Sequence, residues 1–189
     1  MPRARITGTL HGLWPSGHLC ASYSRIGRRF EFAHFVRHVV LGCALARDPR
    51  QGYPARSLVV ARPADPHSDR DYTRVELAPL RDPERVLDDL LAVVREARRR
   101  PLPFVYEPAR DFAEACARAK PNGDDADQRN TALRKARKEF DDGFSGKQDA
   151  YVKLVYPTFD ALREERGPFG FDALSERLLS PFFACRSVT

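Results

Sequence analysis

The sequence lacks the long apolar runs and cysteine patterns on which several protein classes depend. Its 189 residues contain no uninterrupted apolar stretch of about 18 residues, so we expect no membrane-spanning helix. The first residues, MPRARITGTLHG, carry charge and lack the apolar core of a secretory signal. The four cysteines (Cys20, Cys43, Cys116 and Cys185) form no CxxC pair, which argues against a zinc site and a disulfide framework. We therefore expect a reduced chain in the cytoplasm.

Short motifs of several enzyme classes are also missing. The sequence has neither the GxxxxGK[ST] phosphate-binding loop nor the GxGxxG dinucleotide fingerprint, and it has no GxSxG nucleophile motif. His34 and His38 have the spacing of two zinc ligands on one helix face, but the segment HFVRH lacks the glutamate of such sites and no third ligand is obvious. We therefore expect these two histidines to be packed and hydrogen-bonded, with no metal.

Positive charge, in contrast, is present and is concentrated near the start of the chain. The formal net charge is +6. Residues 1–50 contain 8 arginines against Glu31 and Asp48, whereas residues 51–189 carry 24 basic and 24 acidic side chains. The excess therefore lies in the first 50 residues. It is compatible with contact to a polyanion, and equally with a basic surface that keeps the domain soluble or meets an acidic protein.

Apolar spacing and turn residues predict a mixed α/β domain. Strands are expected at residues 5–13, 18–26, 57–61 and 71–77, and residues 150–156 form a further strand-like run. Helices are expected at residues 29–47, from Asp82-Pro83 to the residue before Pro101, and at residues 108–120, 131–140 and 171–184. The order β-β-α-β-β-α, followed mostly by helix, predicts a single domain over residues 1–189, with a mixed sheet flanked by helices and a helical C-terminal layer.

Three basic runs have different structural explanations. Residues 98–100 lie at the C-terminal turn of a predicted helix, where cations are favoured by the helix dipole. Residues 134–138 fit a solvated helix face. Arg25, Arg28 and Arg29 lie before or at a helix N-terminus, where the dipole disfavours cations. These three arginines are therefore our preferred candidates for contact with a phosphate or a partner.

An ordered set of segments resembles a known family. The most specific part is RRPLPF after a leucine-rich helix, followed by ARKEF and DAYVKL. The full set, over residues 6–183, is GLWPSGHLCASYSRI, FVRHVVLG, VLDDLLAVVREARRRPLPF, DFAEACARAK, ALRKARKEF, DAYVKLVY and ALSERLLSPFF. In this order the segments resemble the C-terminal domain of RecC, the gamma chain of exodeoxyribonuclease V.

The resemblance implies a PD-(D/E)XK nuclease-like fold within a RecBCD-type helicase–nuclease complex, which unwinds and degrades duplex ends for recombination. It implies RecB-like and RecD-like subunits as protein partners, and double-stranded DNA ends and separated strands as nucleic-acid partners. It leaves open whether the predicted hairpin, with its turn at Pro15, Ser16 and Gly17, is the strand-splitting wedge of this family. Trp14 beside that turn would either stack on a base or pack against its own domain.

The nuclease site that the resemblance implies lacks its chemistry in this chain. The segment GTLH, which ends at His11, stands where active relatives have GxxD, and Ser22 and Ser24 flank the tyrosine of SYS where those relatives have DYK. His34 and His38 take the places of Gln and Tyr in a QxxxY helix. Mg²⁺ needs hard oxygen ligands, and a lysine positions the water, but the side chains of His11, Ser22 and Ser24 supply neither a carboxylate nor an ammonium. We therefore expect a non-catalytic module without a cofactor.

Two alternatives to this DNA-contacting, partner-docking module stay open. A metal-dependent nuclease would take its carboxylates from Asp65, Asp69, Asp71 and Glu76, although no lysine follows Glu76 in the required place. A protein-interaction domain without DNA contact would not bind DNA even at low salt, whereas backbone contact predicts an affinity that falls steeply as salt rises.

Overall fold

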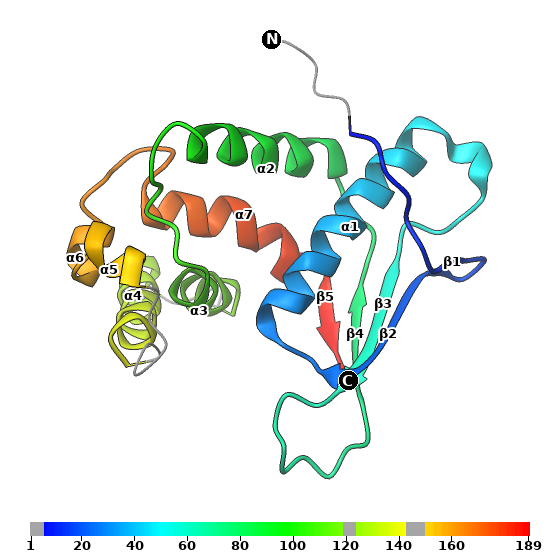
Figure 1. The fold of residues 1–189 in the computed structure, drawn as a ribbon, viewed down its shortest axis with the longest axis horizontal. Helices are drawn as coiled ribbons and strands as arrows, with labels where there is room; N and C mark the ends of the chain where they lie inside the picture. The colour runs from blue at the N-terminus through cyan, green and yellow to red at the C-terminus, as the bar shows by residue number, and fades with distance from the viewer. Residues whose placement is uncertain (1–5, 119–123, 143–149) are drawn as a thin grey trace. The chain divides into compact units, whose positions relative to one another are not determined.

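The computed structural model describes residues 6–118, 124–142 and 150–189. The chain divides into two compact units, one formed by residues 1–84 with residues 186–189 and the other by residues 85–185. The first unit holds the strands and the second is helical (Figure 1). The single domain expected over residues 1–189 stays a prediction.

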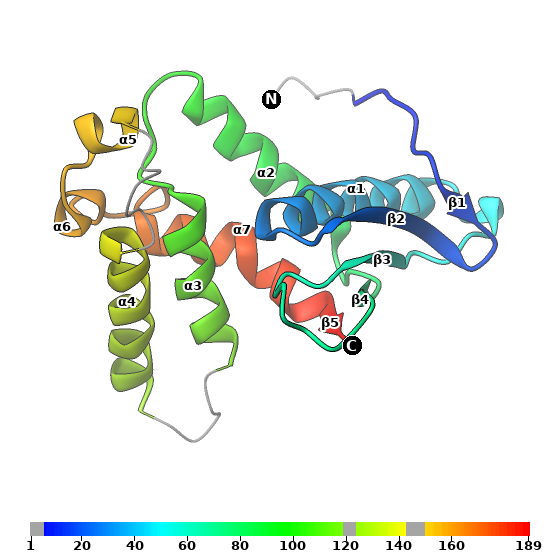
Figure 2. The same cartoon turned by 60° about the horizontal axis from the view of Figure 1, so that its bottom comes forward.

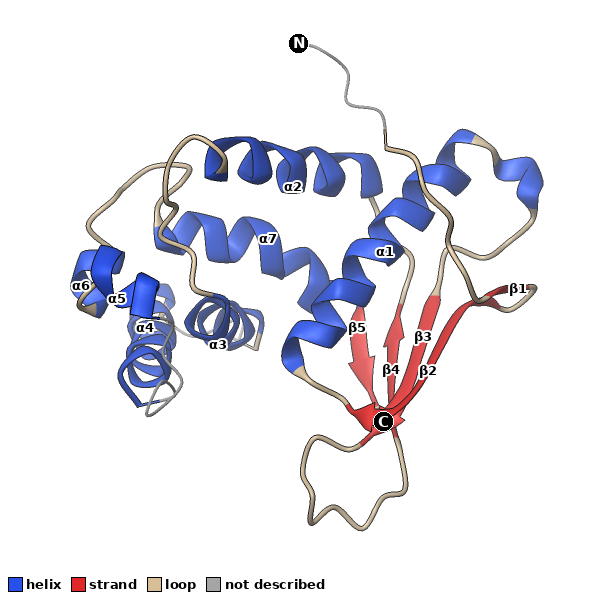
Figure 3. Cartoon of the chain, viewed as in Figure 1, coloured by secondary structure: helices blue, strands red, loops and turns tan. Residues whose placement is uncertain are grey.

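The first unit is built on a five-stranded mixed sheet (Figure 3). In sheet order its strands are β1 (Leu13–Trp14), β2 (Gly17–Arg25), β3 (Ser57–Arg62), β4 (Thr73–Leu77) and β5 (Arg186–Val188). β2 and β3 are parallel, and the other three neighbouring pairs are antiparallel. Parallel neighbours need a crossover connection, which α1 (Arg28–Arg47) and the short helix η1 (Pro49–Gln51) provide.

Helix α1 lies against one face of this sheet (Figure 2). Burial alternates along β3, where Val59 and Ala61 are buried while Leu58 is only half-buried, as expected for a strand with one covered face. Phe35 and Val39 of α1 are completely buried. The core of the first unit therefore lies between α1 and the sheet.

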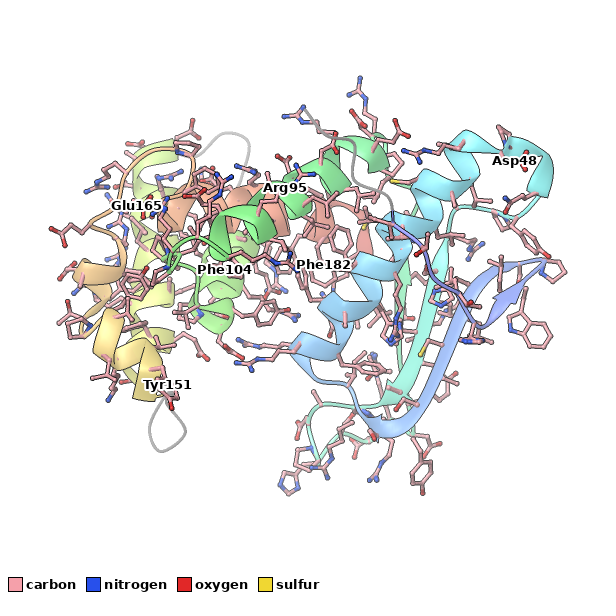
Figure 4. All side chains as sticks on the ribbon, turned by 45° about the horizontal axis from the view of Figure 1, so that its top comes forward. Asp48, Arg95, Phe104, Tyr151, Glu165 and Phe182 are labelled. Carbon is pink, nitrogen blue, oxygen red and sulfur yellow. The ribbon has the colours of Figure 1, made fainter. Side chains whose placement is uncertain are left out.

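The second unit packs helices around phenylalanine rings. Its helices are α2 (Pro83–Ala97, beginning at the unit boundary), α3 (Tyr106–Ala117), α4 (Asp125–Asp142), α5 (Ala150–Val155), α6 (Phe159–Leu162) and α7 (Phe171–Cys185). Phe171 meets Phe112 and Phe159 at ring-centroid distances of 5.8 and 5.4 Å. Glu165 (Figure 4) accepts two hydrogen bonds from Arg100 at 2.7 and 2.8 Å, which fixes the connection between α6 and α7.

The α/β class and the mixed sheet are confirmed, whereas two of the expected strands are wrong. Instead of a strand over residues 5–13, β1 covers only Leu13–Trp14, because Gly12 has φ +78 and turns the chain before the pairing begins. The run at residues 150–156 is not a strand. It forms α5, whose apolar Tyr151, Leu154 and Val155 have the spacing of one helix face.

Candidate functional site

Arg25, Arg28 and Arg29 come together where β2 ends and α1 begins. All three side chains are exposed. Between them, Ile26 is only 5% exposed and its backbone N–H donates to the carbonyl of Arg62 at 2.8 Å. This buried residue fixes the corner, so the backbone positions of the three arginines are held close together where the strand passes into the helix. We call these three residues the arginine corner.

Trp14 lies outside the arginine corner. It belongs to β1 and is paired with Gly17, the first residue of β2, whereas Arg25 is the last residue of that strand. Arg25 follows Gly17 by eight residues, and the two residues lie at opposite ends of β2. The Trp14 side chain is 56% exposed. The four candidate DNA-binding residues therefore lie at two separate places on the first unit, Trp14 at one and the arginine corner at the other.

Of the positions expected to have lost a metal, Ser22 and Ser24 lie on β2, whereas His11 precedes β1. Ser22 and Ser24 are neighbours, and the backbone N–H of Ser24 donates to Ser22 Oγ at 3.2 Å. His11 precedes Gly12, whose carbonyl accepts a hydrogen bond from the Leu19 N–H at 2.8 Å. Leu19 lies three and five residues before the two serines on β2. The degenerate nuclease assignment of these residues stays a prediction.

The alternative carboxylates lie in and after the loop between β3 and β4. Asp65, Asp69 and Asp71 are exposed there. Glu76 on β4 is held by Arg74 and lies 3.8 Å from a guanidinium nitrogen of Arg56. Two arginines thus compete with any cation for this carboxylate. Among the residues that the structure describes, no group of three or more His, Cys, Asp or Glu side chains is placed to hold a metal ion.

A cluster of buried histidines joins α1 to the sheet. His38 Nδ1 lies 2.9 Å from Ser57 Oγ, and its Nε2 lies 3.0 Å from the carbonyl oxygen of Ala78. His18 Nδ1 lies 3.2 Å from the same hydroxyl oxygen, and His34 Nε2 lies 3.3 Å from Cys20 Sγ. The expectation that His34 and His38 are packed and hydrogen-bonded is confirmed. His18, Ser57 and Cys20, which the sequence did not single out, complete the cluster.

The environment keeps this cluster neutral. Burial, followed by the charge of Arg37, lowers the pKa of His34 to about 4, and burial also lowers the pKa of His18 and of His38. Burial raises the pKa of the Cys20 thiol. A reactive cysteine needs a thiolate, so the Cys20–His34 contact lacks the charge state of a nucleophilic pair. The histidine cluster is therefore a structural element of the core.

A helix long and apolar enough to cross a membrane is not found over residues 6–118, 124–142 and 150–189. In a comparison with protein families, the model of the RecC C-terminal domain matches residues 1–117. None of the curated proteins or solved structures that were compared matches the chain. The family match includes β1 to β4, α1 and α2, and ends with α3. Since it covers more than half of the sequence, the chain belongs to the RecC C-terminal domain family.

Proposed function

We propose that the protein is a non-catalytic module of a RecBCD-type helicase–nuclease complex, where it contacts DNA and docks onto partner subunits. Membership of the RecC C-terminal domain family supports a part in this complex, exodeoxyribonuclease V, and in DNA repair. The proposed protein partners are RecB-like and RecD-like subunits. The proposed nucleic-acid partners are double-stranded ends and separated strands during homologous recombination in the cytoplasm.

The proposal includes a degenerate PD-(D/E)XK nuclease-like fold. A mixed sheet with α1 against one face is compatible with it. The side chains at His11, Ser22 and Ser24 supply neither the carboxylates nor the ammonium that this chemistry needs. The proposed role is therefore binding, with no cleavage step.

The arginine corner is the observation that most directly supports the proposed contact with DNA. Arg28 and Arg29 open α1, where the helix dipole disfavours cations, so helix stability does not account for them. Guanidinium groups suit phosphate oxygens because their paired N–H donors match two acceptors at once. The corner is thus suited to a phosphodiester backbone.

Charge reversal of the arginine corner tests this function. The variant R25E/R28E/R29E should lose affinity for duplex DNA of any sequence, because phosphate contacts carry no sequence information. The slope of log K against log salt should fall by roughly 0.9 for each phosphate that the variant no longer neutralises. Fluorescence anisotropy over a series of salt concentrations measures both quantities.

The matched control is R134E/K135E/K138E, which makes the same change of charge on the exposed face of α4. It should leave binding close to that of the unmodified chain. An unchanged affinity in the corner variant would remove the arginine corner from the proposal. Failure of the unmodified chain to bind DNA at low salt would instead support the interaction domain without DNA contact.

A further inference from the structure

The sheet of the first unit has a second face, opposite α1, which we call the outer face. The strand register defines it, because Leu19 pairs with Leu58, Ala21 with Val60, and Arg25 with Arg62 across β2 and β3. On β4 the register continues with Glu76 opposite Leu58 and Arg74 opposite Val60. The side chains on the outer face are those of Leu19, Ala21, Tyr23, Arg25, Leu58, Val60, Arg62, Arg74 and Glu76.

The outer face is open to solvent although it carries apolar side chains. Tyr23 is 89% exposed and Leu19 is 38% exposed. Parallel strand pairs are usually covered on both faces, and here β2 and β3 form the parallel pair of the sheet. Tyr23 stands at the irregularity of β2, between Ala21 and Arg25, where the pairing register with β3 shifts. The irregular strand thus presents a large aromatic ring to solvent.

The charge on the outer face is positive. The guanidinium of Arg62 lies over the Tyr23 ring, 5.6 Å from the ring centroid. Arg25 is the cross-strand neighbour of Arg62. Arg74 lies on the same face, where it pairs with Glu76, the one carboxylate among the side chains of this face. Arginines attract the phosphates of a nucleic acid, and an exposed aromatic ring can stack on its bases. The outer face carries both kinds of side chain next to each other.

We infer that the outer face binds single-stranded nucleic acid, with a base stacked on Tyr23 and the neighbouring phosphate held by Arg62. This inference rests on the proposed DNA contact, and it assigns the contact with a separated strand to this surface and to two of its residues. Bases of a duplex are already stacked on one another, whereas those of a single strand are available to an exposed ring. An exposed aromatic side chain on the sheet can therefore distinguish the two forms.

The test compares a short oligothymidylate with a duplex of equal length, bound to the full chain. Tyr23→Ala should weaken oligothymidylate binding by about 10-fold, the loss typical of one stacked base, and leave duplex binding nearly unchanged. Tyr23→Phe keeps a ring and should restore single-strand affinity. Arg62→Gln should weaken single-strand binding and reduce its salt dependence. The matched control is Tyr151→Ala, since Tyr151 (Figure 4) is 78% exposed on α5 of the other unit.

A second measurement identifies the contact directly. An oligonucleotide carrying a photoreactive halogenated uracil should crosslink to Tyr23, as located by mass spectrometry of the digested complex. Wild-type affinity of Tyr23→Ala for the oligothymidylate, or a crosslink elsewhere, would overturn the inference. The proposed function would survive that result if R25E/R28E/R29E still failed to bind the duplex. If Tyr23→Ala instead abolished only the binding of a RecB-like or RecD-like subunit, the outer face would be a protein-docking surface and the inference would be wrong.

Discussion

At the scale of single residues, the histidine cluster shows how polar side chains are accommodated in this core. The Nε2 of His38 faces the Ala78 carbonyl, so that nitrogen must carry the proton, and Nδ1 then accepts from the Ser57 hydroxyl. Ser57 Oγ also lies 3.2 Å from His18 Nδ1. This assignment of protons follows from the hydrogen-bond network and leaves His38 and Ser57 with partners for their polar hydrogens.

A neutral cluster makes stability depend on pH. In the unfolded chain His34 titrates near 6.5 and in the folded protein at about 4, so the unfolded state binds more protons between these values. Stability should therefore be highest above the unfolded pKa and fall as the pH decreases toward 4, with His34 alone contributing about 3 kcal/mol of that loss. Urea unfolding at a series of pH values measures this slope. His34→Gln should reduce it, and an equal slope in the variant would contradict the assignment.

Only part of this cluster could be predicted from the sequence. His34 and His38 are four residues apart on one helix, and helical periodicity places them on one face. The partners of these histidines come from elsewhere, since Ser57 lies 19 residues beyond His38 and Cys20 lies 14 residues before His34. A periodicity reports the face on which a side chain lies but not the element that meets this face, so these contacts required the fold.

At the scale of elements, the turn between β1 and β2 depends on backbone conformations that favour glycine. Gly17 has φ +126, and a Cβ atom there would approach the carbonyl oxygen of Arg56 to 2.7 Å. That oxygen also accepts the His18 N–H at 3.0 Å, so the backbone there cannot easily shift. The start of the parallel β2–β3 pair therefore requires a residue without a side chain.

Gly17→Ala should accordingly destabilise the protein by about 1–3 kcal/mol, the usual cost of a strained backbone conformation. Chemical denaturation compared with the unmodified chain measures the change. Gly27→Ala is the matched control, because Gly27 has φ −100 and no atom lies within 4 Å of the position that an alanine methyl would take there. The control should change stability by roughly 0.5 kcal/mol or less. Equal effects of the two substitutions would show that the close approach at Gly17 has no energetic role.

Elements with a long internal pattern were predicted well, and elements defined by a distant partner were not. The helix expected at residues 29–47 is α1, Arg28–Arg47, because its apolar positions recur over five turns. β1 and β5 have two and three residues, which is too short for an alternating pattern to be recognised. β5 exists because it pairs with β4, more than a hundred residues earlier in the chain.

At the scale of the whole molecule, the chain leaves the first unit after Glu84 and returns to it at Arg186, where β5 joins the sheet. The returning strand is anchored by two charged contacts, since Arg186 donates to both carboxylate oxygens of Glu31 at 2.8 and 3.3 Å. The family match ends at residue 117, before β5. The sheet described for the first unit therefore combines residues inside the family match with a strand beyond it.

The absence of suitable ligands at the expected nuclease positions leads to a prediction for the complete chain. Purified protein incubated with Mg²⁺ should not cleave linear duplex or single-stranded DNA, because His11, Ser22 and Ser24 offer neither a carboxylate nor a lysine. Gel analysis of end-labelled substrates measures cleavage, and calorimetry measures binding of the metal. The alternative nuclease would depend on Asp71 and Glu76, and Glu76 is already engaged by Arg74.

Asp71→Ala separates a genuine activity from a contaminating nuclease. Cleavage that is equal in the unmodified chain and in Asp71→Ala would come from a contaminant or another site, since Asp71 is one of the exposed carboxylates of the alternative site. Robust cleavage and metal binding that both disappear in Asp71→Ala would establish the metal-dependent nuclease. That outcome would require Glu76 to exchange Arg74 for a divalent ion, and the double charge of the ion is the physical reason such an exchange could occur. Against this alternative, the prediction of a non-catalytic module requires that Arg74 and Arg56 keep their contacts with the Glu76 carboxylate in the presence of Mg²⁺.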